Sequence, residues 1–377
     1  MILKIKKRLT TFDKCVLFIN CISTSVLLLS YLAPVTDPRN LWIIAILGLM
    51  YPLLLILNII FLIYWLIRAK LYVLISAMCI LIGIKILMMN LRFNKLNTFD
   101  KKTIPASIRM MAYNVQGFGK FGKTNNNKLI QKEILQLISD KQPDIINLEE
   151  IYLDIFNRDT VYSSLKKTLR GGYHYFKSYN STRWDSSGIA IFSKFPIIAQ
   201  GSIYSPADHV ETQVIYADIK NGNNIFRVYC LHLQSTQFDD EEHQYLKDVA
   251  KYGEVNLHES KIISGKLKSA FIKRSLQAAL IKHHMAGCPY PFIVAGDFND
   301  TPISFTVNQV SKGLKNAFIE KGNGFGITYY GDFPHSQIDY ILLSPQFNVI
   351  NYRVIDQKLS DHYPIISDLL LTNGLHL

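Results

Sequence analysis

The distribution of apolar residues divides the chain into two parts of different character. Three long apolar stretches occupy the N-terminal part, at about 15–33, 41–67 and 71–89. A bilayer core needs about 20 apolar residues per helix, so we predict three transmembrane helices in a membrane region at 1–89. The middle stretch carries no charged residue, and the third carries only Lys85, close enough to its end to extend towards the interface.

A charged start followed by an apolar stretch also fits a signal peptide over residues 1–33. No small-residue cleavage site is present there, and a second long apolar stretch follows directly, so a transmembrane helix is the better interpretation. With a cytoplasmic N-terminus, seven basic residues lie inside and five outside, which favours a multi-pass protein with its C-terminal domain on the non-cytoplasmic side. If the third stretch does not span, the domain faces the cytoplasm.

After a polar linker at 90–106, short apolar runs alternate with segments of helical periodicity. Runs at 108–114, 144–148, 188–193, 213–219, 225–231, 291–295, 338–343 and 364–370 predict strands, and residues 128–139 and 239–284 have helical character. Such alternation is typical of a layered α/β domain. We place that domain at 107–371, with a short tail at 372–377.

The positive charge of the chain belongs mainly to the membrane region. Residues 1–102 hold 13 of the 41 basic residues and three of the 29 acidic ones, which is +10 of the net charge of +12. The remaining part is nearly neutral, so the basic composition does not indicate nucleic-acid binding. The five cysteines show neither the spacing of a zinc site nor that of a disulfide framework.

Polar side chains stand at the ends of several predicted strands. They are carboxamides, carboxylates and imidazoles, namely Asn114, Glu149, Glu150, His232, Asp297, Asn299, Asp339, Asp361 and His362. Each alone has an ordinary explanation, such as a turn for asparagine or solvation for paired glutamates. Together, the oxygen ligands suit Mg²⁺ or Mn²⁺, and histidines beside acids suit proton transfer. The set favours metal-assisted phosphoryl chemistry.

The stretch VAGDFNDTPIS illustrates the pattern. Asp297 and Asn299 are two positions apart in an extended chain, so their side chains point the same way, and Gly296 leaves room for a close approach. Asp300 begins the following turn and is left out of the site. The G-x-S-x-G motif of serine hydrolases and the Walker loop do not occur in the sequence, and a zinc hydrolase would need more His or Cys ligands.

Seven motifs, taken in order, resemble the endonuclease/exonuclease/phosphatase superfamily, especially its deoxyribonuclease-like and neutral sphingomyelinase-like branches. They are MAYNVQGFG, PDIINLEEI, SSGIAIFSKFPI, YCLHLQS, FIVAGDFNDTP, SQIDYILLS and LSDHYPIISDL, spread over residues 107–371. The resemblance implies a four-layer α/β sandwich, two mixed β-sheets flanked by helices. Together with the predicted transmembrane helices, and with a usage of Lys, Asn and Ile compatible with an AT-rich bacterial genome, it indicates a membrane-anchored member of bacterial type.

The resemblance assigns roles to individual residues. It implies catalytic roles for His232, Asp297, Asn299, Asp339 and His362, and metal binding by Asn114, Glu150 and Asp361. Asp297 and Asn299 would orient the attacking water, and Asp339 would be the carboxylate partner of His362. His232 would contact the scissile phosphate. Glu149 occupies the place usually held by glutamine.

One position departs from the family pattern. Where deoxyribonuclease has a glutamate that orients the first histidine, this chain reads WDSSG. Asp185 is the nearest carboxylate, and the partner of His232 stays open. Arg183 and Trp184, just before it, fit a substrate groove and a plain surface loop equally well.

The resemblance implies an Mg²⁺-dependent or Mn²⁺-dependent hydrolase that cleaves a phosphodiester by attack of an activated water. The predicted membrane anchor favours a lipid head group or another membrane-proximal ester as substrate. A membrane-tethered nuclease is an alternative, and Lys261, Lys266, Lys268 and Lys273 suit it, although a solvated helix face explains them more simply. A catalytically inactive binding module is a second alternative, which the complete set of site residues disfavours.

Overall fold

A computed structural model describes residues 9–94, 102, 104–119, 127–170, 172–204, 213–236, 238–253, 255–331 and 335–372. The described residues form two compact units, one made of residues 9–89 with 303–305 and one made of the described residues in 90–302 and 306–372. Parts of the predicted linker (95–101 and 103) and tail (373–377) lie outside the described residues, as do the basic residues at 4–8. Within the linker, β1 (Arg92–Phe93) pairs with β11 (Asn323–Gly324).

The N-terminal unit consists of helices broken at two points where continuous helices were expected. Its elements are α1 (Thr11–Ser30), α2 (Pro38–Leu49), α3 (Tyr51–Ile67), α4 (Val73–Ile82) and α5 (Ile84–Asn90). Among the described residues, α1 alone is long and apolar enough to cross a bilayer as a single helix. The count reaches three if each bent pair, α2 with α3 at 51° and α4 with α5 at 63°, is one span.

The expectation of continuous helices at 41–67 and 71–89 is therefore wrong, and each break has a local cause. Pro52 lies in the first turn of α3, and because proline lacks a backbone N–H it cannot extend the ladder of α2. Gly83 separates α4 from α5. A Cβ atom there would lie 2.3 Å from the ring of Tyr31, so the ring fills the space of a side chain.

The N-terminal unit has polar residues inside and apolar residues outside. Asn58 lies at the centre: its Nδ2 donates to Ser23 Oγ at 2.9 Å, and its Oδ1 accepts from Thr24 Oγ1 at 2.9 Å. Asn20 Oδ1 accepts from Trp65 Nε1 at 3.0 Å. All of these side chains are buried. The exposed side chains of α1 include Phe12, Phe18, Ile19, Ile22, Leu28 and Leu29.

The second unit contains two mixed sheets. The first has the order β13 (Phe347–Val349), β15 (Ile365–Leu371), β2 (Ile108–Asn114), β3 (Ile145–Asp154), β5 (Asp185–Ser193) and β4 (Tyr173–Ser181), with β14 (Arg353–Val354) on β15. The second has the order β10 (Lys315–Asn316), β12 (Asp339–Leu343), β9 (Phe292–Asp297), β8 (Asn224–His232), β7 (Gln213–Asn221) and β6 (Ile197–Ser202). In these sheets, β2 with β3 and β8 with β9 are parallel pairs, and the other pairs described are antiparallel.

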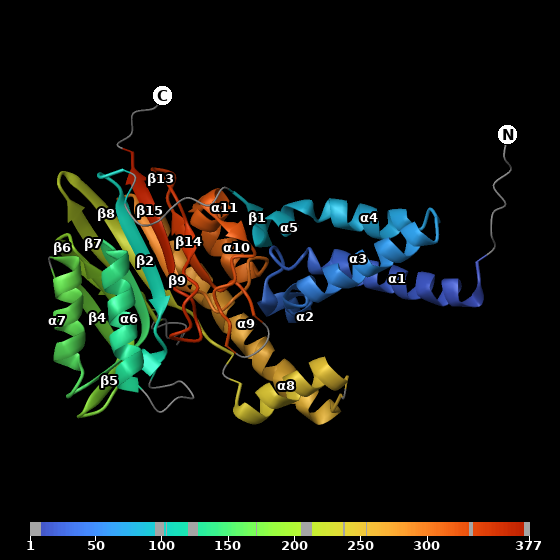
Figure 1. The fold of residues 1–377 in the computed structure, drawn as a ribbon, viewed down its shortest axis with the longest axis horizontal. Coiled ribbons are helices and arrows are strands. Elements are labelled where there is room, and N and C mark those ends of the chain that lie inside the picture. The colour runs from blue at the N-terminus through green and yellow to red at the C-terminus, as the bar shows by residue number, and fades with distance from the viewer. Residues whose placement is uncertain are drawn as a thin grey trace. The chain divides into compact units, whose positions relative to one another are not determined.

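Helices cover the outer faces of the two sheets (Figure 1). On the first sheet lie η1 (Gln116–Gly119), α6 (Asn127–Lys141) and α7 (Arg158–Leu169), whose apolar residues join those of β2 and β3 in one core cluster. On the second lie α9 (Leu257–Ala286) and α10 (Phe305–Ser311). The remaining helices are α8 (Asp240–Tyr252) and α11 (Ala317–Lys321). The expected α/β architecture with mixed sheets is confirmed.

The core between the sheets is formed by alternate residues of facing strands. Met110 and Ala112 of β2 share a cluster with Val228 and Cys230 of β8. Asn147 crosses the same space, because its Nδ2 donates to the carbonyl oxygens of Tyr229 and Ala295, both at 2.9 Å. Apart from Asn147, the residues named here that pack between the sheets are apolar or thiol side chains.

Candidate active site

The predicted site residues meet because their strands are held in register. β8 and β9 are parallel, and His232 pairs with Asp297 at their ends. β12 is antiparallel to β9, so Asp339, its first residue, pairs with Asp297 from the other side. In the first sheet Asn114 ends β2, and its Nδ2 reaches across to Asp297 Oδ2 at 3.2 Å.

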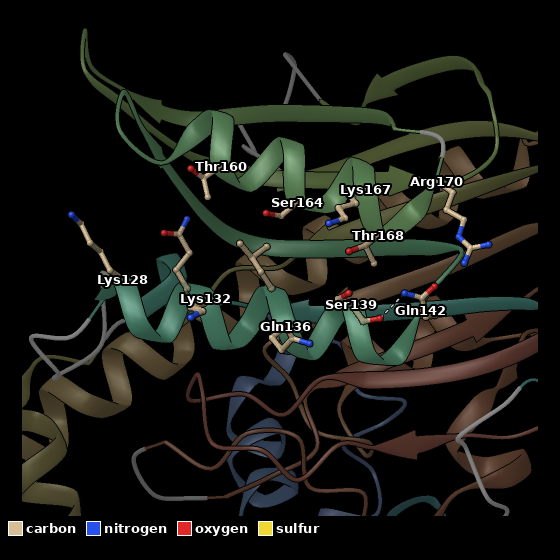
Figure 2. A pocket seen from close by; sticks show the side chains of 12 residues that line it. Lys128, Lys132, Gln136, Ser139, Gln142, Thr160, Ser164, Lys167, Thr168 and Arg170 are labelled. Carbon is tan, nitrogen blue, oxygen red and sulfur yellow. Dashed lines mark hydrogen bonds between the residues drawn. The ribbon is translucent and has the colours of Figure 1, made fainter.

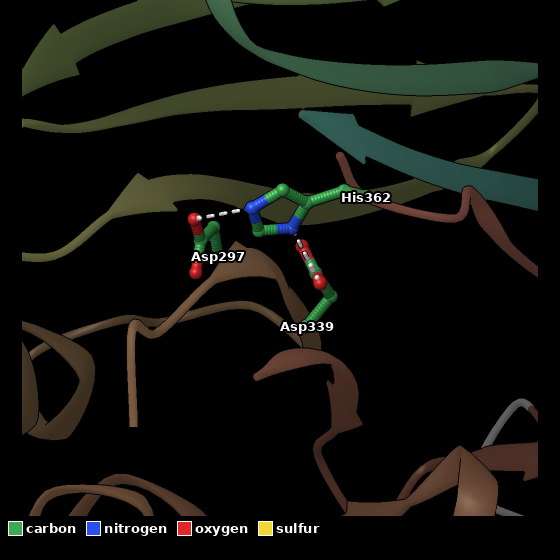
Figure 3. Close-up of side chains that lie close together, drawn as sticks. All are labelled: Asp297, Asp339 and His362. Carbon is green, nitrogen blue, oxygen red and sulfur yellow. Dashed lines mark hydrogen bonds and ion pairs between the residues drawn. The ribbon is translucent and has the colours of Figure 1, made fainter. Parts of the chain in front are cut away.

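His362 lies between two carboxylates (Figure 3). Its Nδ1 donates to Asp339 Oδ2 at 2.9 Å, and its Nε2 lies 3.7 Å from Asp297 Oδ2. Burial alone would lower the pKa of His362, but Asp339 and Asp297 together raise it well above its ordinary value. The two carboxylates therefore favour the charged form of the imidazole, whose Nε2 faces Asp297.

Asp297 is the centre of the hydrogen-bond network. The backbone N–H of Asn299 donates to Oδ1 at 2.7 Å, and the side-chain amide of Asn299 donates to Oδ2 at 3.2 Å. Asn299 has a left-handed backbone, with φ of 51°, which turns its side chain back towards Asp297. Burial raises the pKa of Asp297 to about 6, although His362 opposes the shift.

Gly296 makes room for this arrangement. Its φ is +139°, and a Cβ atom there would lie 2.2 Å from Leu231 O and 2.7 Å from Glu149 Oε1. Only glycine avoids both contacts. Asp300 was predicted to lie outside the site. It is buried, and its Oδ2 accepts a hydrogen bond from Arg274 Nε at 3.1 Å.

A β-bulge places both adjacent glutamates on the inner side of the first sheet. The pairing of β3 with β5 shifts between Leu148 and Ile151, and Glu150 has a φ of 51°. In a regular strand adjacent residues face opposite sides, and the extra residue of a bulge cancels that alternation. Glu150 Oε1 accepts from Asn114 Nδ2 at 3.1 Å.

Glu149 lies deeper than Glu150. It is fully buried, and its Oε1 accepts from Cys230 Sγ at 3.3 Å. Burial, with a contribution from Asp339, raises the pKa of Glu149 well above its ordinary value. This shift favours the protonated, neutral form of the side chain beside Glu150.

His232 has an amide partner that the sequence did not predict. His232 Nδ1 lies 2.7 Å from Gln213 Oε1, and the two residues are paired directly across β7 and β8. His232 Nε2 points the other way, at 3.5 Å from Glu150 Oε1 and 3.7 Å from Asp297 Oδ2. Burial lowers the pKa of His232, although Asp297 opposes the shift. Asp185, the nearest carboxylate in the sequence, instead accepts from Tyr152 Oη at 2.9 Å.

Carboxylates converge here closely enough to require a counter-charge. Burial raises the pKa of Glu150; the hydrogen bond from Asn114 opposes the shift and Asp361 adds to it. Ligand atoms of Asp297, Asp339 and His362 all lie within 4.8 Å of one another. We nevertheless regard Asp339 and His362 as a hydrogen-bonded pair, because a metal between them would displace their short contact. Glu150, Asn114 and Asp361 carry oxygen atoms of the kind that Mg²⁺ or Mn²⁺ prefers.

A hollow without any predicted site residue lies on the outer face of the first sheet, between α6 and α7 (Figure 2). It has a volume of about 650 Å³, and its basic residues are Lys128, Lys132, Lys167 and Arg170. No predicted site residue is among the described residues that line it. Its volume is therefore no guide to the chemistry at the strand ends.

Comparison with protein-family models assigns the fold to a family. The model of the endonuclease/exonuclease/phosphatase family matches residues 111–362, about two thirds of the chain. The chain belongs to this family. Members of the endonuclease/exonuclease/phosphatase family are hydrolases that act on phosphate esters, and they typically depend on a divalent metal. A second model, described as a domain of unknown function, matches residues 13–89.

Three solved structures are similar to this family member, and one of them has a TM-score above 0.5. The catalytic domain of human nocturnin, solved with a bound sulfate anion, is 19% identical, covers 71% of this chain and 96% of its own, and gives a TM-score of 0.51. A family protein from Leptotrichia buccalis is 18% identical over 70% of this chain and 99% of its own, with a TM-score of 0.48. A mannosyl-6-phosphatase from Bacteroides thetaiotaomicron is 17% identical over 70% of this chain and 100% of its own, with a TM-score of 0.46. No curated protein matches the sequence.

Proposed function

We propose that this family member is a membrane-anchored, divalent-metal-dependent phosphodiesterase. The observation that carries the proposal is the environment of Asp297, which lies within 3.7 Å of imidazole nitrogens of both His232 and His362 and within 3.2 Å of two side-chain amides. A proton acceptor with a pKa of about 6 suits general-base catalysis near neutral pH.

The proposed roles follow from the contacts of each side chain. Asp297 accepts a proton from the attacking water, and Asn299 holds that carboxylate in place. His362, kept charged by Asp339, donates a hydrogen bond from Nε2 to a phosphate oxygen. His232 contacts the phosphate from the other side through its Nε2, which lacks a hydrogen-bond partner among the described residues.

The proposed metal ligands are Glu150, Asn114 and Asp361, with Mg²⁺ or Mn²⁺ as the cation. The raised pKa values of Glu150 and Asp297 support this assignment, because buried carboxylates in proximity are costly unless a cation offsets their charge. The bound cation supplies charge neutralisation for the phosphate. Asn114 links the two groups, since its Nδ2 donates to both Glu150 and Asp297.

We further propose that residues 11–90 cross the bilayer three times, with each bent helix pair as one span. The inside-out pattern supports this: buried Asn20, Asn58 and Ser76 satisfy one another, while the exposed faces of the helices carry leucine, isoleucine and phenylalanine. Lipid requires polar groups to be satisfied internally and tolerates apolar surfaces. With the N-terminus in the cytoplasm, the catalytic domain lies on the non-cytoplasmic side, and a C-terminal fusion to an extracytoplasmic reporter enzyme tests this.

A nuclease is the second candidate, and the charge distribution disfavours it. The Lys266 ammonium, part of the basic cluster on α9, bonds Glu242 Oε2 at 2.5 Å and lies 3.5 Å from Asp239. Nucleic-acid binding needs cations that face the phosphate backbone and are not already neutralised. An inactive binding module is disfavoured because the site residues keep mutually supporting contacts.

A substrate panel tests the proposal. The full chain, reconstituted in vesicles, is offered bis-p-nitrophenyl phosphate, sphingomyelin and single-stranded DNA, each with Mg²⁺ and with EDTA. We expect Mg²⁺-dependent hydrolysis of the first two substrates. DNA cleavage that collapses with salt would favour the nuclease. No turnover of any substrate by folded protein would support the binding module.

A further inference from the structure

Three exposed apolar side chains form a patch beyond the metal-binding end of β3. Phe156 is 84% exposed, Trp184 58% and Ile155 54%, and we call these three residues the rim patch. The backbone N–H of Ile155 donates to Trp184 O at 3.2 Å, which joins the segment after β3 to the β4–β5 hairpin. Single exposed apolar residues are ordinary, but adjacent ones on two loop tips mark an interaction surface.

The rim patch lies next to the end of β3, the strand that carries Glu150. β3 continues from Glu150 to Asp154, and at roughly 3.3 Å per residue the patch is about 15–20 Å further along the sheet. Tyr179 of β4 lies between them: burial, with the nearby Glu150 carboxyl, raises the pKa of its hydroxyl. The rim patch and Glu150 are therefore connected by one continuous strand of the first sheet.

The charged residues next to the rim patch in sequence disfavour a polyanionic partner. Its charged neighbours in sequence are Arg158, Arg183, Asp154, Asp159 and Asp185, a net charge of −1. The Arg183 guanidinium lies 4.9 Å from the centre of the Trp184 ring. A protein surface that binds nucleic acid needs an excess of cations, and the aliphatic side chain of Ile155 offers no ring on which a base could stack. Tryptophan, phenylalanine and arginine on a near-neutral surface are the composition found at a zwitterionic membrane interface.

A bilayer is also the partner that the chain keeps close. Only Leu91 separates the last residue of α5 from the first residue of β1. With residues 11–90 in the bilayer as proposed, this short connection tethers the second unit to the membrane. Such tethering raises the effective concentration of the bilayer at any apolar surface of the domain.

We propose that the rim patch of Ile155, Phe156 and Trp184 docks on the surface of a zwitterionic phospholipid bilayer and so presents membrane phosphoesters to the site. The presentation of membrane phosphoesters rests on the proposed function, whereas docking does not, because docking does not require catalysis. The aromatic side chains enter the interfacial region, and Arg183 extends to lipid phosphates. Removal of the patch would weaken engagement of membrane-borne substrate without altering chemistry on soluble substrate.

Fluorescence tests docking independently of activity. The full chain and its W184F variant are reconstituted in phosphatidylcholine vesicles with and without bromine on the acyl chains. The difference between the two proteins isolates the emission of Trp184 from that of Trp42 and Trp65. We expect brominated lipid to quench this emission. An unquenched Trp184 would overturn the proposal.

Kinetics test the consequence of docking. Phe156→Ser should raise the apparent KM for a vesicle-borne phosphodiester about tenfold and leave turnover of bis-p-nitrophenyl phosphate unchanged. The control is Ile198→Ser, because Ile198 is also an exposed apolar residue, at 50% exposure. It lies in β6, which follows the end of β5 that is opposite Trp184. This variant should change the kinetics on neither substrate. Equal losses on both substrates, no loss on either, or a loss on DNA alone would each overturn the proposal. Quenching of Trp184 without turnover of any substrate would support docking and refute the proposed function.

Discussion

Replacement of Asp297 by asparagine should stabilise the fold while it abolishes activity. A pKa raised from 3.8 to about 6 means that the ionised carboxyl costs the folded state about 3 kcal/mol above pH 6. The amide removes that cost and keeps the acceptor for the Asn299 N–H at Oδ1. It loses the two 3.2 Å contacts at Oδ2, worth about 1–2 kcal/mol together. The net gain is about 1–2 kcal/mol.

The predicted gain in the free energy of unfolding depends on pH. Because the pKa of Asp297 is raised on folding, the wild-type chain loses stability as pH rises from about 4 to 6, and the loss is complete above that window. Asp297→Asn lacks this loss. The advantage of the variant should therefore be near zero or negative at pH 4, grow up to pH 6 and stay constant above it.

The assay is thermal unfolding of the full chain in detergent with EDTA, from pH 4 to 8. A gain of this size corresponds to a rise in midpoint of roughly 2–6 °C at pH 8. The matched control is Asp368→Asn, at an equally buried carboxylate that accepts from Arg109 Nε at 2.7 Å. That variant leaves a buried guanidinium unpaired and should lower stability by about 3–5 kcal/mol. A loss of stability in Asp297→Asn at pH 8, or a gain independent of pH, would refute the reasoning.

Three further predictions concern positions outside the proposed metal site. Gln213→Leu should lower kcat about tenfold by releasing the ring of His232, and Gln213→Glu should restore most of it; equal rates in all three proteins would show that the amide does not position the ring. Gly296→Ala should lower the free energy of unfolding by about 3 kcal/mol. The control Gly265→Ala, in open space on α9, should change it by less than about 1 kcal/mol, with both compared to the wild-type chain in denaturant unfolding. Asn58→Leu should lower the thermal midpoint of the full chain in detergent, because it leaves several buried hydroxyls without their partner; an unchanged midpoint would contradict the described network.

Strand-end residues could be predicted from the sequence because they interrupt apolar runs. Asn114, His232 and Asp297 each follow a run whose residues are buried in the structure, and such a change from apolar to polar is visible without coordinates. The pairing of Asp339 with His362 was also predicted, from the resemblance. Strand pairing then brings these residues together, because the register aligns the ends of neighbouring strands.

Other features depend on backbone geometry that composition does not reveal. The bulge that turns Glu149 and Glu150 to one side needs a left-handed residue, and glutamate gives no signal of one. Gln213 was missed because an amide at the start of a strand has no distinctive chemistry until its cross-strand neighbour is known. Elements β4 and α7 were not predicted, since β4 is an edge strand with mostly exposed side chains. Pro52 and Gly83 were visible in the sequence, but the length of the apolar stretches outweighed them.

The most direct test of the proposed phosphodiesterase is the Mg²⁺-dependent rate of bis-p-nitrophenyl phosphate hydrolysis by the full chain and by its His362→Ala variant. His362 interacts with both Asp339 and Asp297, whereas His283 is exposed and serves as the matched control in His283→Ala. The account predicts turnover in the wild-type chain and in His283→Ala, and its loss in His362→Ala and with EDTA. Undiminished turnover in His362→Ala would contradict it.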